Sequence, residues 1–219
     1  AVPAWREKSG QQGLIIGYAG GTIARLWSQT EAKDSFAHIQ GVEIDKRVLA
    51  ASRRFFSEDD FGINVAVDDG RRFLARSEQE YDIIAVDAYS NEFQIPFHLT
   101  TTEFISLASK KLADDGILVL NVALGVEQSP MFRRLANTTA SVFPYVYQLS
   151  SDNSYNALLI ASSRPLEAAT VYKSLNRIAP DLGEKFSYKQ IAFDDRNSIF
   201  TDDRAPVELL SELSMLYLL

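Results

Sequence analysis

Short apolar runs alternate with helical patterns along most of the chain. The first run, residues 13–18, ends in a glycine-rich turn, and residues 22–30 then show the apolar spacing of a helix. Because the runs are almost continuously apolar, they predict parallel strands that are buried on both faces of a sheet. The expected strands are residues 13–18, 38–44, 64–67, 82–86 and 116–122, and the expected helices are residues 22–30, 46–56, 71–76 and 101–112.

The pattern changes after residue 122. A helical stretch at residues 128–142 is followed by two apolar runs, residues 144–149 and 155–161, which a short polar link joins. Two strands so connected predict an antiparallel hairpin. Parallel strands that end in such a hairpin are the ground plan of the class I methyltransferase fold, so we expect a Rossmann-like, doubly wound α/β domain. Residues 166–177 and 206–219 are expected helices on either side of an irregular acidic stretch, and residues 1–219 are expected to form a single domain.

The amino-acid composition limits the classes of function that are compatible with the chain. The 219 residues include 22 Lys plus Arg and 29 Asp plus Glu, for a net charge of −7, and 46% are hydrophobic. The acidic balance disfavours nucleic acid and suits a cationic substrate, although a solvated acidic surface is the commoner explanation. Cysteine is absent, which excludes disulfides, a thiolate nucleophile and cysteine-bound metals and fits a reducing compartment. No segment is apolar for long enough to span a membrane, so we predict a cytoplasmic protein without a membrane partner.

Ligands of open α/β sheets bind beyond the carboxyl ends of the strands, where this sequence places glycines and carboxylates. The first strand ends in Gly17-Tyr18-Ala19-Gly20-Gly21, which matches a G-x-G-x-G turn except at Ala19. Glu43 ends the second strand and can accept both hydroxyl hydrogens of a ribose, whereas Asp45 is interpreted as a helix cap. The third strand runs into Asp68-Asp69-Gly70, whose carboxylates can accept an exocyclic amine or cap a helix.

The fourth strand ends in Asp87-Ala88-Tyr89-Ser90, where we expect the reaction to occur. A carboxylate at the tip of this strand faces the space above the glycine turn. There it can orient and help to deprotonate an amine, or it can pair with a cation. Asp87 is therefore the candidate catalytic residue, with a structural aspartate bonded to loop amides as the alternative.

Taken in order, these motifs resemble the spermidine synthase family of aminopropyltransferases. The resemblance rests on LIIGYAGGTIARL (residues 14–26), GVEIDKRVLAASRRFF (41–56), VDDGRRFL (67–74), YDIIAVDAYS (81–90), IPFHLTTTEFISLASKKLADDGILVLNV (95–122) and the late TDDRAPVE (201–208). It implies that decarboxylated S-adenosylmethionine is bound by Gly17, Tyr18, Ala19, Gly20, Gly21, Glu43, Asp69 and Gly70. It also implies that Asp87 helps to deprotonate putrescine, that methylthioadenosine is released, and that no metal takes part.

The sequence departs from the family at three places. The second acidic residue of the family's D-x-x-D motif is Ser90 here, and Glu92 is the nearest substitute. The glycine turn is shorter than the family's G-G-G-D-G-G. We expect the family's N-terminal β-rich segment to be absent or truncated, because about a dozen residues precede the first expected strand. We expect Tyr89, Ser90, Glu92 and His98 to line the acceptor site.

Two other functions remain open on the sequence. One is a methyltransferase that uses ordinary S-adenosylmethionine to methylate a small molecule, since the fold is shared and the changed motif suits another acceptor. The other is a non-catalytic nucleoside-binding domain. A C-terminal apolar stripe is expected to pack on the core or on a second copy in a homodimer; it comprises Leu209, Leu210, Leu213, Leu216 and Tyr217.

Overall fold

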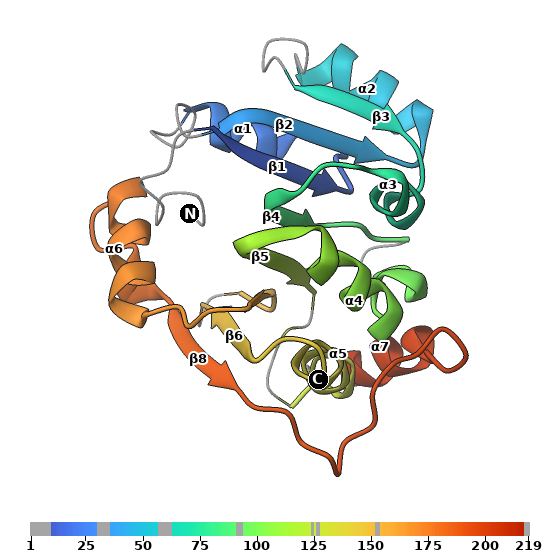
Figure 1. Cartoon of the computed structure of the whole chain (residues 1–219), viewed down its shortest axis with the longest axis vertical. Helices are drawn as coiled ribbons and strands as arrows, with labels where there is room; N and C mark the ends of the chain where they lie inside the picture. Colours follow the sequence, from blue (N-terminus) through green and yellow to red (C-terminus); the bar gives the residue numbers. More distant parts are fainter. Residues whose placement is uncertain are drawn as a thin grey trace.

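The computed structural model describes residues 10–29, 36–56, 63–90, 94–123, 125, 128–151 and 154–216. Within these residues the chain forms an eight-stranded sheet of order β3-β2-β1-β4-β5-β7-β6-β8 (Figure 1). The first five strands pair in parallel, and β7, β6 and β8 pair antiparallel. The strands are β1 (Gln11–Ile16), β2 (Phe36–Glu43), β3 (Asn64–Val67), β4 (Tyr81–Val86), β5 (Leu112–Val122), β6 (Tyr145–Ser150), β7 (Ala157–Ser162) and β8 (Ser187–Ile191).

Helices cover both faces of the sheet, as the near-continuous apolar strands predict. One core contains Leu74, Phe104 and Leu135 and lies under α3, α4, α5 and α7. The other contains Trp27 and Leu175 and lies under α1, α2 and α6. The expected doubly wound α/β fold is therefore confirmed. The helices are α1 (Thr22–Gln29), α2 (Lys46–Phe56), α3 (Gly70–Arg76), α4 (Thr102–Lys111), α5 (Pro130–Ala140), α6 (Ala168–Ile178) and α7 (Val207–Met215), with short 3-10 turns η4 (Phe97–Leu99) and η5 (Gly183–Lys185).

The strand order fixes where a ligand can bind. The chain moves from β1 outward to β2 and β3, returns to pair β4 with the other side of β1, and continues to β5. β1 is therefore the switch point, and the loops that leave β1 and β4 diverge to opposite sides above their carboxyl ends. Asp87 follows β4 directly, and its amide donates to the Ile16 carbonyl at 2.8 Å. The tips of the two strands are thus held together beneath this crevice.

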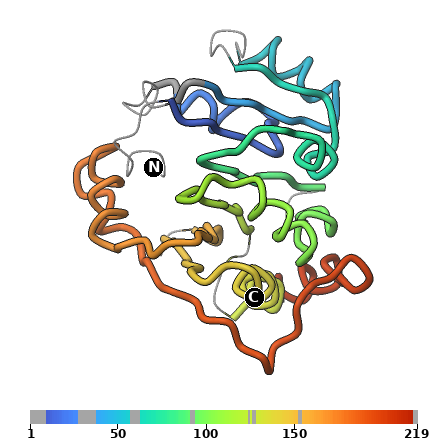
Figure 2. The backbone as a smooth tube through the Cα atoms, viewed as in Figure 1, coloured from blue at the N-terminus to red at the C-terminus, as the bar shows by residue number. Residues whose placement is uncertain are grey.

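The hairpin of β6 and β7 forms as expected, but it is not the end of the sheet. β7 lies between β5 and β6, and β8 adds a further antiparallel strand beyond β6. The expectation of irregular structure at residues 187–191 is wrong, because β6 provides pairing there and Tyr188 stacks on Tyr147 with ring centroids 4.9 Å apart. Figure 2 shows the chain leaving β8 along the lower edge of the molecule and returning to α7.

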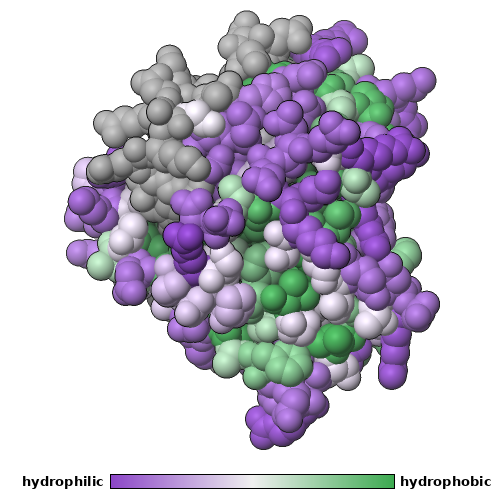
Figure 3. Space-filling model, viewed as in Figure 1, coloured by the Kyte–Doolittle hydropathy of each residue, from purple (hydrophilic) through white to green (hydrophobic). Residues whose placement is uncertain are grey.

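The C-terminal helix divides the expected apolar stripe between two environments. Of the residues of this stripe, Leu210 packs against the core, whereas Leu209, Leu213 and Leu216 are exposed, and Tyr217 lies outside the described residues. A homodimer through the exposed residues stays a prediction. In the view of Figure 3, polar residues predominate around the rim and apolar residues come to the surface nearer the middle. Among the described residues, no helix combines the length and apolar character needed to cross a membrane.

Candidate functional site

A cavity of about 370 Å³ lies beyond the carboxyl ends of β1, β2, β3 and β4. We call it the acidic cavity, because four of its lining residues are carboxylates: Glu43, Asp68, Asp69 and Asp87. Gly17, Ala19, Gly70, Tyr89 and His98 also line it, so most of the residues expected at the site come together. The other lining residues are Ile16, Val42, Ile44, Val48, Ala88, Pro96 and Leu99.

The glycine turn after β1 packs tightly on the β4 tip. Gly17 has a φ of +86°, and a Cβ there would lie 2.4 Å from the Asp87 carbonyl oxygen, so only glycine fits. Ala19 occupies the middle position of the G-x-G-x-G pattern and has a φ of +46°, a conformation that costs an alanine free energy. The amides of Gly17 and Tyr18 both donate to the Val42 carbonyl, at 3.0 and 3.1 Å. The turn is therefore bound to β2 as well as to β4.

Glu43 holds this turn through its side chain. Its carboxylate is buried and accepts the Ala19 amide at 2.9 Å and the Asp45 amide at 3.0 Å, one on each oxygen. Because a carboxylate oxygen has lone pairs for more than one donor, both oxygens can still accept hydroxyl hydrogens from the cavity. Asp45 instead caps α2, as interpreted from the sequence: it accepts the Arg47 amide at 2.8 Å, and hydrogen bonds from the Arg47 side chain lower its pKa to about 2.

The two aspartates after β3 have different partners. Asp69 caps α3 by accepting the Arg72 amide at 2.8 Å, and its other oxygen lies 2.8 Å from His98 Nε2. Asp68 is ion-paired with the Arg72 side chain, whose hydrogen bond lowers the pKa of the carboxyl. The capping interpretation of Asp69 is therefore confirmed. The cap leaves the His98-facing oxygen at the cavity wall.

Asp87 stands at the tip of β4 next to Asn121 of β5. The Asn121 side-chain amide donates to Asp87 Oδ1 at 2.7 Å. This bond orients the carboxylate and leaves Oδ2 for a ligand. A carboxylate in this position can bind an ammonium group or accept a proton from it.

The loop that follows Asp87 directs its polar groups away from the cavity. The Tyr89 hydroxyl donates to the Asn121 carbonyl at 2.7 Å and accepts the Ala123 amide at 2.9 Å. Burial raises the pKa of this hydroxyl, so it stays protonated. The Ser90 hydroxyl donates to the Gln94 carbonyl at 3.1 Å, and Ser90 does not line the cavity. Glu92 lies outside the described residues.

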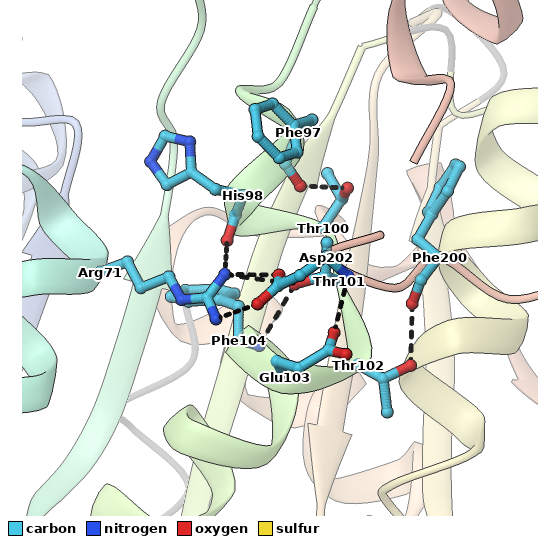
Figure 4. A network of polar contacts seen from close by, with 10 residues as sticks. All are labelled: Arg71, Phe97, His98, Thr100, Thr101, Thr102, Glu103, Phe104, Phe200 and Asp202. Carbon is cyan, nitrogen blue, oxygen red and sulfur yellow. Dashed lines mark hydrogen bonds and ion pairs between the residues drawn. The ribbon is translucent and has the colours of Figure 1, made fainter. Parts of the chain in front are cut away.

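A polar network supports the wall that carries His98 (Figure 4). Arg71, in the first turn of α3, donates to the His98 carbonyl at 3.2 Å and to both carboxylate oxygens of Asp202 at 2.7 Å. Thr101, the N-cap of α4, also donates to Asp202, at 2.7 Å. Hydrogen bonds therefore connect the TDDR motif (residues 201–204) to the first turn of α3 and to Thr101, which follows η4.

A second cavity, of about 330 Å³, opens on the face of the sheet covered by α1 and α6. We call it the apolar cavity. It shares Asp87 with the acidic cavity and also contains Asn121. Its remaining lining residues are Ile23, Leu26, Trp27, Ile83, Ala85, Val86, Val119, Leu158 and Ile178.

Some expected residues do not line either cavity. Tyr18 is buried under the turn, where its ring packs against Gly21 and Gly41, and Gly20 faces Phe56. Conversely, no role for Asn121, Ile44 or Asp202 was predicted from the sequence. The signal for Asn121 is its place at the end of an apolar strand, which is the same signal that singled out Asp87. Within the described part of the chain, no group of three or more His, Cys, Asp or Glu residues is placed to hold a metal ion.

The fold matches those of a methyltransferase-like protein and of a spermidine synthase. Human methyltransferase-like protein 13, solved with SAH, superposes with a TM-score of 0.65 at 19% identity, over 85% of this chain and 86% of that chain. A spermidine synthase solved with the transition state analogue AdoDATO superposes with a TM-score of 0.62, also at 19% identity, over 96% of this chain and 67% of that chain. The fold is thus that of the class I methyltransferases, which spermidine synthases share.

Sequence comparison decides whether the chain belongs with the spermidine synthases or with the other proteins of this fold. A family model described as the spermine/spermidine synthase domain matches residues 1–151, and the chain belongs to this family. A probable polyamine aminopropyl transferase of Bifidobacterium longum is 32% identical over 96% of this chain and 51% of that protein. The chain therefore spans about half the length of this relative. The expected resemblance to the spermidine synthase family is confirmed.

Proposed function

We propose that this chain carries an aminopropyltransferase site, which transfers the aminopropyl group of decarboxylated S-adenosylmethionine to a primary amine and releases methylthioadenosine. Membership of the spermine/spermidine synthase family supports this reaction, as does the similarity to a protein named as a polyamine aminopropyl transferase. The residues of the acidic cavity support a division of roles among its walls.

The nucleoside part is assigned to the tips of β1, β2 and β3. Glu43 accepts the ribose hydroxyls, and the turn at Gly17 and Ala19 lets the ligand approach the backbone. Asp69 is assigned the exocyclic amine of the base, with the oxygen that also faces His98 as the acceptor. Ile44, whose side chain is exposed beside this cavity, offers apolar surface to the flat ring.

The negative charge of the acidic cavity is the reason for proposing decarboxylated rather than ordinary S-adenosylmethionine as the co-substrate. Its lining includes four carboxylates and, among the described residues, neither lysine nor arginine. Decarboxylated S-adenosylmethionine carries a sulfonium and an ammonium group and has no carboxylate, so it suits these walls. Ordinary S-adenosylmethionine would bring a carboxylate among like charges without a cationic partner in the lining, which disfavours it.

Asp87 is assigned the proton transfer. An alkylammonium has a pKa of about 10.4, so the acceptor arrives protonated at neutral pH. The Asp87 carboxylate binds it and takes one proton, and the neutral nitrogen then attacks the aminopropyl carbon next to sulfur. The new carbon–nitrogen bond forms as the carbon–sulfur bond breaks, and the electron pair leaves with methylthioadenosine. Asn121 keeps Asp87 in position for this step.

Calorimetry with the two nucleosides tests the proposed charge selection. We expect decarboxylated S-adenosylmethionine to bind about tenfold more tightly than S-adenosylmethionine, which corresponds to about 1.4 kcal/mol. Asp87→Asn should leave the affinity for methylthioadenosine unchanged, because this product lacks the aminopropyl group. Equal or tighter binding of S-adenosylmethionine would overturn the choice of co-substrate.

A further inference from the structure

His98 and Asp69 meet at the wall of the acidic cavity. Nε2 of His98 lies 2.8 Å from Oδ2 of Asp69, and both residues line the cavity. Asp69 stands at the start of α3, whereas His98 lies in η4, between β4 and α4. Their side chains are 30% and 27% exposed for His98 and Asp69, so a ligand and solvent protons can both reach them. The contact associates His98 with the carboxylate that is assigned the base, rather than with the acceptor site expected from the sequence.

The hydrogen in this contact belongs to His98. An ionised carboxylate only accepts hydrogen bonds, so Nε2 must be the donor. Oδ1 of Asp69 already accepts the Arg72 amide at 2.8 Å in the cap of α3. Oδ2 is therefore the oxygen that accepts from His98, and it has a further lone pair for an amine of the ligand.

The backbone of His98 is held from the opposite side. The Arg71 guanidinium donates to the His98 carbonyl at 3.2 Å and is itself ion-paired with Asp202. Figure 4 shows this carbonyl turned toward Arg71 and the imidazole ring turned the other way. The ring also meets the Phe97 ring edge to face, with centroids 5.7 Å apart. These contacts hold His98 where its ring can fix the direction of the Asp69 carboxylate.

We propose that His98 is a positioning residue for the nucleoside and that its protonation weakens binding of the base. Neutral His98 donates to Oδ2 of Asp69 and holds this oxygen where it accepts the exocyclic amine. Protonated His98 forms an ion pair with Asp69 and adds a positive charge to the cavity. The oxygen then becomes a weaker acceptor, and the cationic co-substrate is attracted less strongly. This inference rests on the proposed function, because it deepens the role assigned to Asp69.

The groups around His98 restrict the pH range in which this effect can be isolated. Aspartates and glutamates ordinarily titrate near pH 4, arginine stays charged, and histidine changes charge between pH 5 and 8. A comparison of pH 8 with pH 5.5 therefore addresses the histidine. Among the described residues, the charged groups near it are Asp69 and Arg71 at the start of α3, Asp202 and Glu103 in the network behind it, and Glu43, Asp68 and Asp87 in the cavity.

Calorimetry with methylthioadenosine at pH 8 and pH 5.5 tests the proposal. We expect the dissociation constant for the unaltered protein to rise about tenfold at pH 5.5, because His98 is then protonated. His98→Gln keeps an N–H donor but cannot gain a proton. It should bind within about twofold of the unaltered protein at pH 8 and lose the pH dependence. His98→Leu lacks the donor and should bind about fivefold more weakly at pH 8, with little change at pH 5.5.

The other histidine of the chain provides a matched control. His38 lies exposed on β2 and does not line the acidic cavity. His38→Gln makes the same chemical change as His98→Gln at this distant position. It should keep both the affinity at pH 8 and the tenfold pH dependence of the unaltered protein.

The outcomes separate this inference from the proposed function. Binding at pH 8 that does not weaken at pH 5.5, or that weakens equally in His98→Gln, overturns the role of His98 and leaves the proposed function standing. A His98→Leu variant that binds as tightly as the unaltered protein at pH 8 also overturns it, because the carboxylate then needs no positioning. If the unaltered protein does not bind methylthioadenosine at pH 8, the proposed function fails and this inference falls with it.

Discussion

Arg71 and Asp202 lie 131 positions apart in the chain and meet in a two-pronged ion pair, with both nitrogen–oxygen distances at 2.7 Å. Arg71 follows the Gly70 start of α3 and also holds the His98 carbonyl. The pair therefore joins the segment after β8 to the wall of the acidic cavity. A residue from the C-terminal part of the chain is thereby linked to the wall of a site whose described lining residues all come from the first half.

This pair should make stability depend on pH. The Arg71 hydrogen bonds, followed by that from Thr101, hold the pKa of Asp202 below its ordinary value. A lowered folded-state pKa gives stability that is fully present above the unfolded pKa, about 3.9, and is lost as pH falls through the folded value. Asp202→Asn should therefore lower the free energy of unfolding by about 1 kcal/mol at pH 7 and by less below pH 4. The expected loss is modest because solvent screens this partly exposed pair.

Urea unfolding at pH 7 and pH 3 measures this difference. Asp203→Asn, a change in the exposed neighbouring residue, serves as the matched control and should alter the unfolding free energy little at either pH. A loss in Asp202→Asn that is as large at pH 3 as at pH 7 would show that the ion pair is not its cause.

The glycine turn gives a graded series of three variants. Gly17→Ala should destabilise by about 2 kcal/mol or more, because its Cβ would meet the Asp87 backbone at 2.4 Å. Gly20→Ala should be nearly neutral, since the nearest atoms there belong to the Phe56 ring at 3.6 Å. Ala19→Gly should stabilise by up to about 1 kcal/mol by relieving the positive φ. Thermal or urea unfolding ranks the three, and a destabilised Ala19→Gly would contradict the strain.

Much of the fold could be predicted from the sequence because its signals are local. β4 is buried at every position, and the strands of the parallel half are short apolar runs, so their periodicity identifies them. β8 could not be predicted, because Ser187 and its neighbours form a half-exposed edge strand with little apolar character. Its formation depends on β6, which lies about forty positions earlier in the chain.

Some residues of the candidate site could likewise be predicted from the sequence, and others could not. Gly17, Glu43, Asp69 and Asp87 each end a strand, and parallel strands bring such ends together, so their convergence follows from the pattern. Asn121 and Asp202 act through partners on other elements. No spacing within the sequence predicts a contact such as that between Asp202 and Arg71.

Glu43→Gln should weaken nucleoside binding and loosen the turn. Both carboxylate oxygens accept backbone amides, and a glutamine would present its own N–H groups to one of these two donors. We expect the dissociation constant of methylthioadenosine to rise about tenfold or more by calorimetry. Asp45→Asn at the α2 cap is the control and should bind as the unaltered protein does; an unaffected affinity in Glu43→Gln would refute the ribose assignment.

Asn121→Ala should affect turnover more than binding. Loss of the 2.7 Å bond to Asp87 frees the carboxylate to turn away from the acceptor, so kcat should fall about tenfold or more. The affinity for methylthioadenosine should stay constant, because Asn121 does not line the acidic cavity. If kcat is unchanged while nucleoside affinity falls, the positioning role is wrong.

In the proposed reaction, this chain transfers an aminopropyl group with Asp87 as the base. Mass spectrometry of the nucleoside product tests it directly, after incubation with decarboxylated or ordinary S-adenosylmethionine and a pool of monoamines and diamines. We predict methylthioadenosine from the decarboxylated donor, dependent on added amine, and none with Asp87→Asn. S-adenosylhomocysteine from the ordinary donor, or methylthioadenosine formed equally well by Asp87→Asn, would contradict the account.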